Sequence, residues 1–263
     1  MKNKKRRGKG ITLVLSGGGA KGLAHIGVIE VLVKDKIPIK RIVGTSAGAL
    51  VGGFYAAGKI KELKNLFLSL NRWEVYKLFF SFPSREGIFN SKKIDLLLKN
   101  YLSDIKIEKL KIPFTAVAFD MTKNEKVLFE KGSLFNAIRA SISIPSYFKP
   151  FQLGNSMFID GGIVDVMPVD VAKRQSKRLP IVGVNVEVPP IIKIDRFNIF
   201  TMFDYARNHV MTQISRLEGE GADVIIEPKN EYGHWEYDKA KEIIESGRKE
   251  AKKLLPKIRR LLK

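Results

Sequence analysis

Two glycine-rich turns in the first fifty residues constrain the fold more than any other feature of the chain. The first spans residues 17–22 (GGGAKG) and the second spans residues 44–48 (GTSAG). Each follows a short run, Ile11–Leu15 or Arg41–Val43, that we interpret as a buried strand. Each also precedes a segment with helical periodicity, so the order strand, turn, helix occurs twice in succession. That order predicts a parallel sheet with right-handed crossovers.

Periodicity and turn residues predict further alternation along the rest of the chain. The expected helices are Lys21–Lys36, Ala47–Ala57, Ser91–Leu102, Ser133–Ser141 and one or more after Tyr237, and the expected later strands are Pro113–Phe119, Glu125–Phe129, Phe151–Leu153, Met157–Ile159, Ile181–Val186 and Val224–Ile226. We therefore expect an α/β fold in which helices flank a parallel-type central sheet. It divides into a basic N-terminal tail (residues 1–10), one main domain (11–226) and a basic helical C-terminal extension (227–263).

The composition excludes several kinds of site. The chain has no cysteine, which rules out disulfides, thiolate metal ligands and a cysteine nucleophile. Its three histidines, His25, His209 and His234, are isolated from one another in the sequence, so a zinc site is not expected either.

The net charge of +20 is concentrated at the two ends. Residues 1–10 hold six Lys or Arg and no acid, and residues 239–263 hold ten against three acids, which places thirteen of the twenty net charges there. Such ends suit an anionic surface, either lipid headgroups or nucleic acid, and equally suit a solvated tail and helix. Apolar runs are too short for a secretion signal or a membrane span. We expect a cytoplasmic protein that contacts anionic membranes peripherally through residues 2–9 and the helix around Lys249–Lys263, presenting the cleft of Ser46 to lipid.

The first glycine loop fits an anion without specifying which one. Its glycines satisfy the dinucleotide-binding pattern, but the second strand ends without the acidic residue that would hold a ribose. The phosphate-binding P-loop pattern fails because Leu23, not lysine, follows Gly22. What remains is a set of backbone N–H groups at a helix start, where an oxyanion or a phosphate fits equally well.

The second loop places a serine on a strand-to-helix turn. Gly44 and Gly48 flank Ser46 and remove side chains that would clash in so tight a turn, as in a nucleophile elbow. The alternative is an ordinary turn in which Ser46 caps the following helix. The best base for a serine here is Asp160, which follows a short strand and precedes two glycines; Asp120 and Asp165 compete with it. A triad with His209 or His234 also remains open, although both histidines lie in contexts typical of surface or packing residues.

Four motifs in this order resemble those of the patatin-like phospholipases, in particular the bacterial branch and the neuropathy target esterase type. They are GGGAKG at 17–22, GTSAG at 44–48, RASISIP at 139–145 and DGG at 160–162, and the resemblance covers roughly residues 11–226. The resemblance implies that Asp160 acts on Ser46 directly, and that no metal or other cofactor takes part. It also implies an oxyanion hole formed by the loop of Gly17, Gly18, Gly19 and Gly22, and lipid acyl esters as substrates.

The expected function is that of a serine acyl hydrolase acting on phospholipid or lysophospholipid through an acyl-enzyme. An aspartate with an unperturbed pKa of about 3.9 is a poor base at neutral pH, so the site should be partly buried. A soluble carboxylesterase or thioesterase with the same dyad is the alternative. A nucleotide- or nucleic-acid-binding protein would use the glycine loop but leave Ser46 and Asp160 without a role, so no nucleic acid is expected. The aromatic stretch Leu66–Phe82 and the patch Ile199–Phe203 fit either an acyl-binding wall or ordinary core packing.

Overall fold

The computed structural model describes residues 9–84, 87–89, 91–187, 199–229 and 231–263. Its main sheet has the strand order β10-β9-β1-β2-β5-β8-β7, with β6 paired to β5 as well. The strands are β1 (Ile11–Leu15), β2 (Ile39–Thr45), β5 (Phe114–Asp120), β6 (Glu125–Phe129), β7 (Phe151–Leu153), β8 (Ser156–Asp160), β9 (Ile181–Val184) and β10 (Val224–Ile226). A separate pair is formed by β3 (Phe80–Ser84) and β4 (Gly87–Phe89).

The expected α/β class is confirmed, with a parallel centre and an antiparallel side. Along the order β10-β9-β1-β2-β5, each strand pairs parallel with the next. Strands β6 and β8 pair antiparallel with β5, and β7 pairs antiparallel with β8. The tight turns before β6 and β8 explain the β5–β6 and β7–β8 pairings, because a connection of a few residues joins only antiparallel strands. The sheet is therefore mixed rather than parallel throughout.

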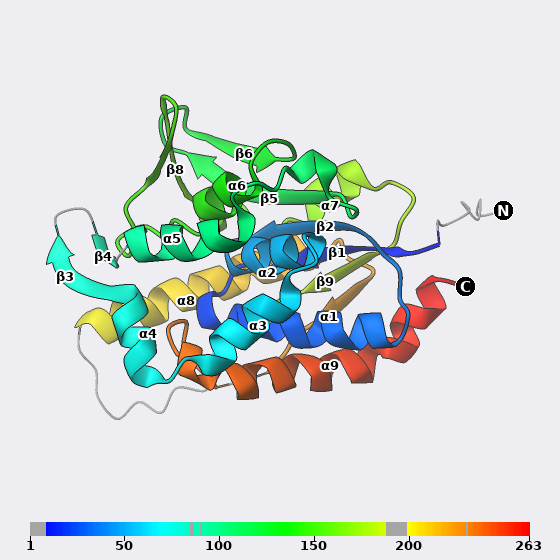
Figure 1. Cartoon of the computed structure of the whole chain (residues 1–263). Helices are drawn as coiled ribbons and strands as arrows, with labels where there is room; N and C mark the ends of the chain where they lie inside the picture. Colours follow the sequence, from blue (N-terminus) through cyan, green and yellow to red (C-terminus); the bar gives the residue numbers. More distant parts are fainter. Residues whose placement is uncertain (1–8, 85–86, 90, 188–198, 230) are drawn as a thin grey trace.

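Helices cover both faces of this sheet (Figure 1). They are α1 (Ala24–Lys34), α2 (Ala47–Ala56), α3 (Ile60–Ser69), α4 (Arg72–Phe79), α5 (Ser91–Leu102), α6 (Leu134–Ser141), α7 (Val169–Gln175), α8 (Ile199–Gly219) and α9 (Ala240–Leu261), with short 3₁₀ turns η1 (Gly19–Leu23), η2 (Ile107–Lys109), η3 (Gly161–Ile163) and η4 (Tyr237–Lys239). The expected helix at residues 21–36 thus begins as a 3₁₀ turn inside the glycine loop.

Side-chain alternation along β1 sends its residues into two cores. Ile11, Leu13 and Leu15 belong to the larger cluster, which includes residues of α1, α2 and α9. Val14 points the other way and packs in a smaller cluster with residues of α7. This is the two-residue period of a strand that is buried on both faces.

The C-terminal helix α9 lies directly against α1 (Figure 1). A Cβ atom on Gly27 would overlap the Ile244 carbonyl oxygen, and one on Gly247 would overlap the Ala24 carbonyl oxygen. Glycine at both positions lets the two backbones approach closely. The helix expected after Tyr237 is thus present, and Ile243, Ile244 and Ile258 bury its inner face in the larger core.

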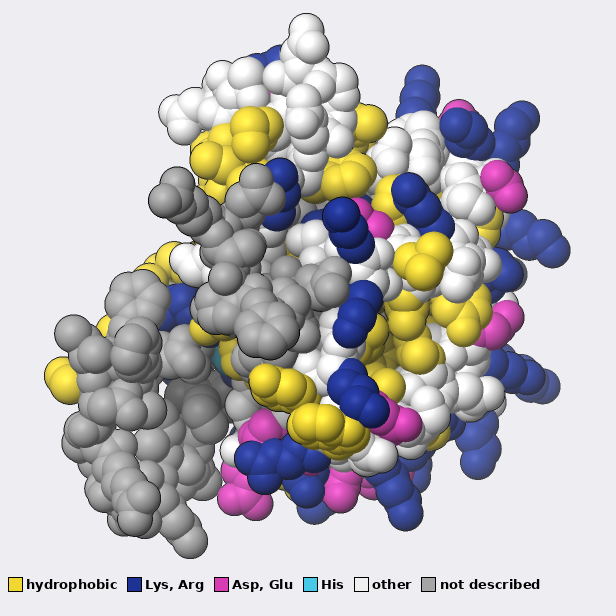
Figure 2. All heavy atoms as spheres, turned by 60° about the vertical axis from the view of Figure 1, so that its left-hand side comes forward, with side chains coloured by type: hydrophobic (Ala, Val, Ile, Leu, Met, Phe, Trp, Pro, Cys, Tyr) yellow, Lys and Arg dark blue, Asp and Glu magenta, His cyan; other side chains and the backbone are white. Residues whose placement is uncertain are grey.

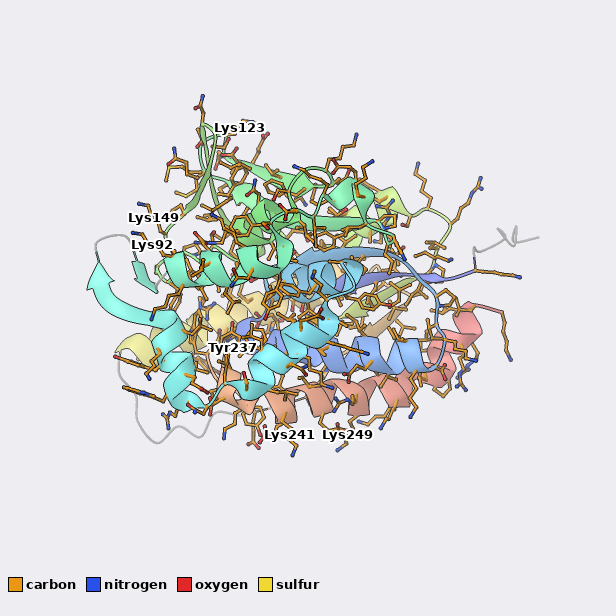
Figure 3. The ribbon with its side chains drawn as sticks, in the orientation of Figure 1. Lys92, Lys123, Lys149, Tyr237, Lys241 and Lys249 are labelled. Carbon is orange, nitrogen blue, oxygen red and sulfur yellow. The ribbon has the colours of Figure 1, made fainter. Side chains whose placement is uncertain are left out.

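The face drawn in Figure 2 carries more basic than acidic side chains. Figure 3 shows Lys241 and Lys249 projecting outward from α9, while Lys92, Lys123 and Lys149 project from other parts of the molecule. Among the described residues, no helix is long and apolar enough to cross a bilayer.

Candidate functional site

Ser46 stands on a strained turn between β2 and α2. Its backbone has φ 53° and ψ −121°, in the region that side-chain-bearing residues rarely adopt. A Cβ on Gly48 would overlap the Leu15 carbonyl group, and one on Gly44 would lie 2.6 Å from the Gly48 carbonyl carbon. The flanking glycines therefore allow α2 to start close against the ends of β1 and β2. Ser46 is at the N-cap position, yet its hydroxyl makes no capping hydrogen bond to this helix.

The Ser46 hydroxyl instead faces Asp160. Its Oγ lies 2.5 Å from Oδ2 of Asp160, and the other carboxylate oxygen accepts the Gly162 N–H at 2.7 Å. Asp160 ends β8, where it pairs with Ala118 of β5, and a Cβ on Gly161 would overlap the Val117 carbonyl oxygen. The antiparallel pairing of β8 with β5, together with Gly161, brings the Asp160 carboxylate to Ser46. Ser46 follows β2, the strand on the other side of β5.

Burial gives Asp160 the character of a base. Desolvation raises the pKa of its carboxyl group to about 6, against the opposing hydrogen bonds from Ser46 and the Gly162 N–H, and the negative charge of Glu187 raises it further. A carboxylate with a pKa near 6 is mostly ionised at neutral pH and still binds a proton readily. The Ser46 and Asp160 side chains are both buried, at 5% and 6% exposure.

The two competing aspartates are engaged elsewhere. Asp120 accepts hydrogen bonds from the N–H groups of Thr122 and Lys123 in the turn after β5. Asp165 forms an ion pair with Lys126 at 2.8 Å. Each therefore stabilises local structure, as an aspartate at a strand end commonly does.

The histidines lie apart from the serine and aspartate. His25 is fully buried with its Nε2 2.9 Å from the Ser16 carbonyl oxygen, and burial lowers its pKa to about 4. His209 is exposed on α8 beside Tyr205. His234 is buried, and its Nε2 contacts Glu187. Among the described residues, none of the three forms a hydrogen bond with Ser46 or Asp160.

The glycine loop borders Ser46. The Gly17 N–H donates to the Val166 carbonyl oxygen at 2.9 Å, so that group is already engaged. Gly18 and Gly19, with φ of 146° and 55°, begin η1, and the first N–H groups of a helix have no acceptor within it. A Cβ on Gly22 would overlap the Ala47 side chain, so glycine there lets η1 pack on the start of α2.

Two serines that carried no expected role support the site from the RASISIP segment. The Ser46 N–H donates to Oγ of Ser141 at 2.9 Å, and the Ser141 hydroxyl donates to the Val117 carbonyl oxygen at 2.6 Å. The Ser143 carbonyl oxygen accepts the Asp160 N–H at 3.0 Å. The motif itself was the only signal for these residues, since their partners are distant in the sequence.

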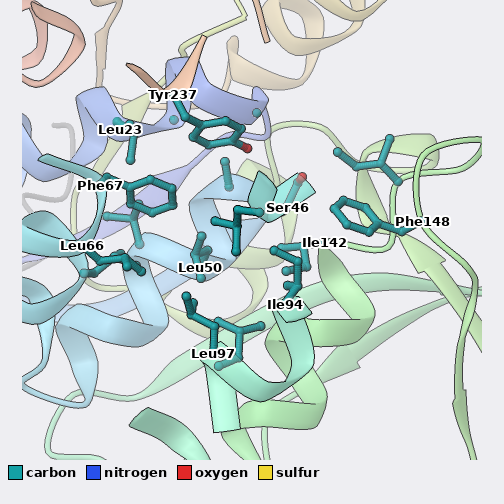
Figure 4. A pocket seen from close by; sticks show the side chains of 18 residues that line it. Leu23, Ser46, Leu50, Leu66, Phe67, Ile94, Leu97, Ile142, Phe148 and Tyr237 are labelled. Atoms are coloured by element: carbon teal, nitrogen blue, oxygen red, sulfur yellow. The ribbon is translucent and has the colours of Figure 1, made fainter. Parts of the chain in front are cut away.

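An apolar cavity opens beside Ser46 (Figure 4). Gly19, Gly22, Ser46 and Ala47 line it at the loop side, and its other walls are Leu23, Leu50, Val51, Leu63, Leu66, Phe67, Leu78, Ile94, Leu97, Leu98, Ile142, Ile144, Phe148 and Tyr237. Phe67 stacks on Tyr237 at 5.3 Å between ring centroids. The stretch Leu66–Phe82 thus contributes Leu66, Phe67 and Leu78 to a wall, while Trp73 and Tyr76 are exposed.

The remaining expectations concern metals and the second apolar patch. Within the described part of the chain, no group of three or more His, Cys, Asp or Glu could hold a metal ion. Met202, in the patch at residues 199–203, is exposed on α8. The side chains at 79–82 and most of those in the patch lie outside the described residues.

A serine on a strained strand-to-helix turn, beside a buried carboxylate and an apolar cavity, is an arrangement typical of serine hydrolases. Within that class, the chain belongs to the patatin-like phospholipase family, whose model matches residues 13–173.

Relatives in the curated proteins agree with this family. An uncharacterized NTE family protein of Mycobacterium tuberculosis is 37% identical over 185 residues, which cover 70% of this chain and 49% of that protein. The neuropathy target esterase sws of Drosophila melanogaster is 29% identical over 171 residues, covering 62% of this chain and 12% of that protein. The lysophospholipase NTE1 of Candida glabrata is 32% identical over 176 residues, which cover 62% of this chain and 10% of that protein. The chain thus spans about half the length of the mycobacterial relative.

A solved structure shows the same fold. The crystal structure of VipD from Legionella pneumophila matches with a TM-score of 0.55, covering 95% of this chain and 67% of VipD. At 16% identity the likeness concerns the arrangement of helices and strands alone.

Proposed function

We propose that this chain is a serine acyl hydrolase that cleaves fatty-acyl esters of phospholipids or lysophospholipids. The observation that carries the proposal is the 2.5 Å hydrogen bond between Ser46 and a buried Asp160 whose pKa is raised to about 6. The names of relatives in the same family, neuropathy target esterase and lysophospholipase, agree with ester chemistry on lipids.

The reaction proceeds through an acyl-enzyme. Oγ of Ser46 attacks the carbonyl carbon of the ester while its proton passes to Oδ2 of Asp160. When the ester C–O bond breaks, the leaving alkoxide takes that proton from Asp160. Water then gives a proton to Asp160 and attacks the acyl carbon, which releases the fatty acid and restores the Ser46 hydroxyl.

The glycine loop stabilises the oxyanion of each tetrahedral intermediate. We assign the donors to the N–H groups of Gly18 and Gly19, because the Gly17 N–H is bonded to Val166. Gly17 and Gly22 then serve the site by shaping the loop, since Gly22 lets η1 approach Ala47. The start of η1 adds the positive end of a helix dipole to these donors.

The cavity favours an acyl chain over a nucleotide. Its walls beyond the loop consist almost entirely of Leu, Ile, Val and aromatic side chains, which suit a hydrocarbon and include no charged group for a phosphate. Fatty-acid release from phosphatidylcholine, lysophosphatidylcholine and p-nitrophenyl butyrate tests the proposal. We expect release from at least one lipid and none with Ser46→Ala. Turnover of the small ester or of a thioester alone would favour the soluble carboxylesterase or thioesterase.

We also propose that the protein attaches to anionic membranes from a cytoplasmic location. Lys249, Lys252, Lys257 and Arg260 are exposed along the second half of α9, and Lys263 is exposed just past its end. The other basic segment, residues 2–9, lies outside the described residues except for Lys9. Polybasic segments of this kind bind anionic leaflets electrostatically.

The start of β1 and the last turn of α9 lie at one end of the sheet, away from Ser46. The Ile11 N–H donates to the Pro38 carbonyl oxygen, and Arg259 pairs with Asp35, so both residues lie near the loop before β2. Ser46 directly follows Thr45, the last residue of β2, and therefore lies at the opposite end of this strand. Docking through the second half of α9 therefore places Ser46 at the far end of β2 from the membrane contact. The attachment that we propose holds the protein near the bilayer without orienting the cavity.

A further inference from the structure

We propose that Lys21, Glu187 and His234 form a buried ionic network that holds the glycine loop in its oxyanion-binding conformation. The network lies outside the Ser46–Asp160 pair and takes no proton in the reaction. The inference rests on the proposed function, because it assigns these three side chains as positioning residues for that same site.

The three side chains meet in the protein interior. Nζ of Lys21 lies 3.2 Å from Oε2 of Glu187, and Nε2 of His234 lies 3.0 and 3.1 Å from the two Glu187 oxygens. Their side chains are only 2%, 6% and 8% exposed. Burial alone would raise the pKa of Glu187, but the charges and hydrogen bonds of His234 and Lys21 outweigh it and hold that pKa well below its usual range. Glu187 is therefore a charged group inside the protein, kept there by its partners.

Each member comes from a different segment around the loop. Lys21 belongs to η1, two residues after Gly19. Glu187 lies three residues beyond the end of β9, and His234 precedes η4 near the start of α9. The network thus connects the loop to the segments of Glu187 and His234, which follow Lys21 by at least 166 residues in the chain.

The same two segments form the surface on which the loop rests. A Cβ on Gly18 would overlap the Val186 side chain, and one on Gly19 would lie 2.5 Å from the His234 carbonyl oxygen. The Ala20 N–H donates to that carbonyl oxygen at 2.8 Å, and the Val186 N–H donates to the Ser16 hydroxyl at 3.0 Å. Any shift of residues 186, 187 or 234 therefore moves the candidate donors at Gly18 and Gly19.

This arrangement gives the network a catalytic consequence. An oxyanion hole acts because its donors are fixed before the charge develops, so displacing them lowers the rate of the chemical step. Substrate binding depends on the apolar cavity, whose walls the network does not form. Loss of the network should therefore reduce kcat and leave KM nearly unchanged.

The test compares steady-state kinetics and amide hydrogen exchange of four variants with the wild type. Glu187→Ala removes the shared carboxylate, Glu187→Gln keeps its shape and one acceptor oxygen, and Lys21→Met/Glu187→Gln removes both charges of one pair. Glu30→Gln is the matched control, because Glu30 accepts from both Lys64 and Arg248 at 2.7 Å but lies on α1, away from the loop.

We expect kcat of Glu187→Ala for a soluble ester to fall about tenfold to a hundredfold, less than the roughly 10²–10³-fold caused by removing an oxyanion donor itself. KM should stay within about twofold, and Glu187→Gln should recover part of kcat. Exchange of the peptide that covers residues 16–24 should quicken about tenfold in Glu187→Ala and in the double variant, and not in Glu30→Gln.

The outcomes separate this proposal from the proposed function. If Glu187→Ala, which removes the acceptor of Lys21 and His234, does not fold, two variants decide the matter. Glu187→Gln keeps an acceptor oxygen in place, and the double variant also removes the Lys21 ammonium group. A lower unfolding temperature with unchanged kcat and unchanged exchange at residues 16–24 would show a merely structural network and overturn the inference. A wild-type protein without ester hydrolysis would refute the proposed function, and the exchange measurement would still decide whether the network holds the loop.

Discussion

The hydroxyl of Ser46 donates a hydrogen bond to Oδ2 of Asp160 over 2.5 Å, although 114 residues separate the two in the chain. Three features of the fold produce this contact. The strained turn directs the serine out of α2, the antiparallel pairing of β8 with β5 carries the aspartate to the same place, and Gly161 allows the close approach.

The first prediction concerns this pair as a unit. Ser46→Ala and Asp160→Asn should each lower kcat for p-nitrophenyl butyrate by at least about 10³-fold, and the double variant should be hardly worse than either single variant, because residues that act on one step are not additive. Steady-state kinetics on the three variants measures this. Near-normal turnover of Asp160→Asn would show that another group takes the proton.

The second prediction is a pH dependence of activity. Since burial raises the pKa of Asp160 to about 6, kcat/KM should fall about tenfold for each pH unit below that value, as the base becomes protonated. A profile for a soluble ester, measured between about pH 4 and about pH 8, locates this limb. A limb near the ordinary aspartate value of about 4 would mean that Asp160 is not the base or is not buried.

The same pKa shift predicts a change in stability. A carboxyl whose pKa is higher in the folded state stabilises the fold at low pH, and this contribution is lost as the pH rises through about 6. Ionised Asp160 should then cost up to about 3 kcal/mol at neutral pH. Asp160→Asn should therefore be more stable than the wild type at about pH 8 and similar to it at about pH 4 in denaturant unfolding. An equal stability difference at both pH values would contradict the shift.

The third prediction concerns the cavity. Ile94 lies on α5 and lines the cavity (Figure 4), whereas Leu96 on the same helix is 65% exposed. Ile94→Trp should lower kcat/KM for p-nitrophenyl palmitate at least about tenfold more than for the butyrate ester, because each methylene excluded from the cavity forfeits about 0.8 kcal/mol. Leu96→Trp is the control and should leave both values unchanged. Equal losses for both esters with Ile94→Trp would place the acyl chain elsewhere.

The fourth prediction concerns membrane attachment. Replacing Lys249, Lys252 and Lys257 by Gln should weaken binding to phosphatidylglycerol vesicles by up to about a hundredfold, at roughly fivefold for each lysine near an anionic surface. Replacing Lys92, Lys123 and Lys149, which project elsewhere (Figure 3), removes the same charge and should have a smaller effect. Vesicle sedimentation at low and high salt measures both. Equal binding to phosphatidylcholine, or binding indifferent to salt, would exclude the electrostatic mechanism and leave the Ser46 chemistry untouched.

Local sequence signals accounted for the parts of the fold that depend on neighbouring residues. The glycines around Ser46 indicate the tight turn because only they fit against Leu15 and the start of α2. The hairpin at residues 151–160 was likewise predictable from its Gly154-Asn155 turn. The pairing of β8 with β5 carried no such signal, because no turn joins these two strands.

Contacts between residues that are distant in the sequence could not be predicted. Two following glycines favoured Asp160 over Asp120 and Asp165. No local pattern indicated that Asp165 pairs with Lys126 or that Asp120 accepts a hydrogen bond within the turn after β5. No local pattern singles out Glu187, and the context of His234 is typical of a surface or packing residue. Their pairing with Lys21 depends on three segments folding together, which no spacing in the sequence encodes.

Covalent labelling at Ser46 tests the central claim most directly. A fluorophosphonate phosphonylates an activated serine far faster than an ordinary one, so mass spectrometry of the labelled peptide locates the nucleophile. We predict one adduct on Ser46 in the wild type, greatly slowed labelling in Asp160→Asn, and none in Ser46→Ala. An adduct on a different serine, or no adduct on a folded wild-type protein, would contradict the account.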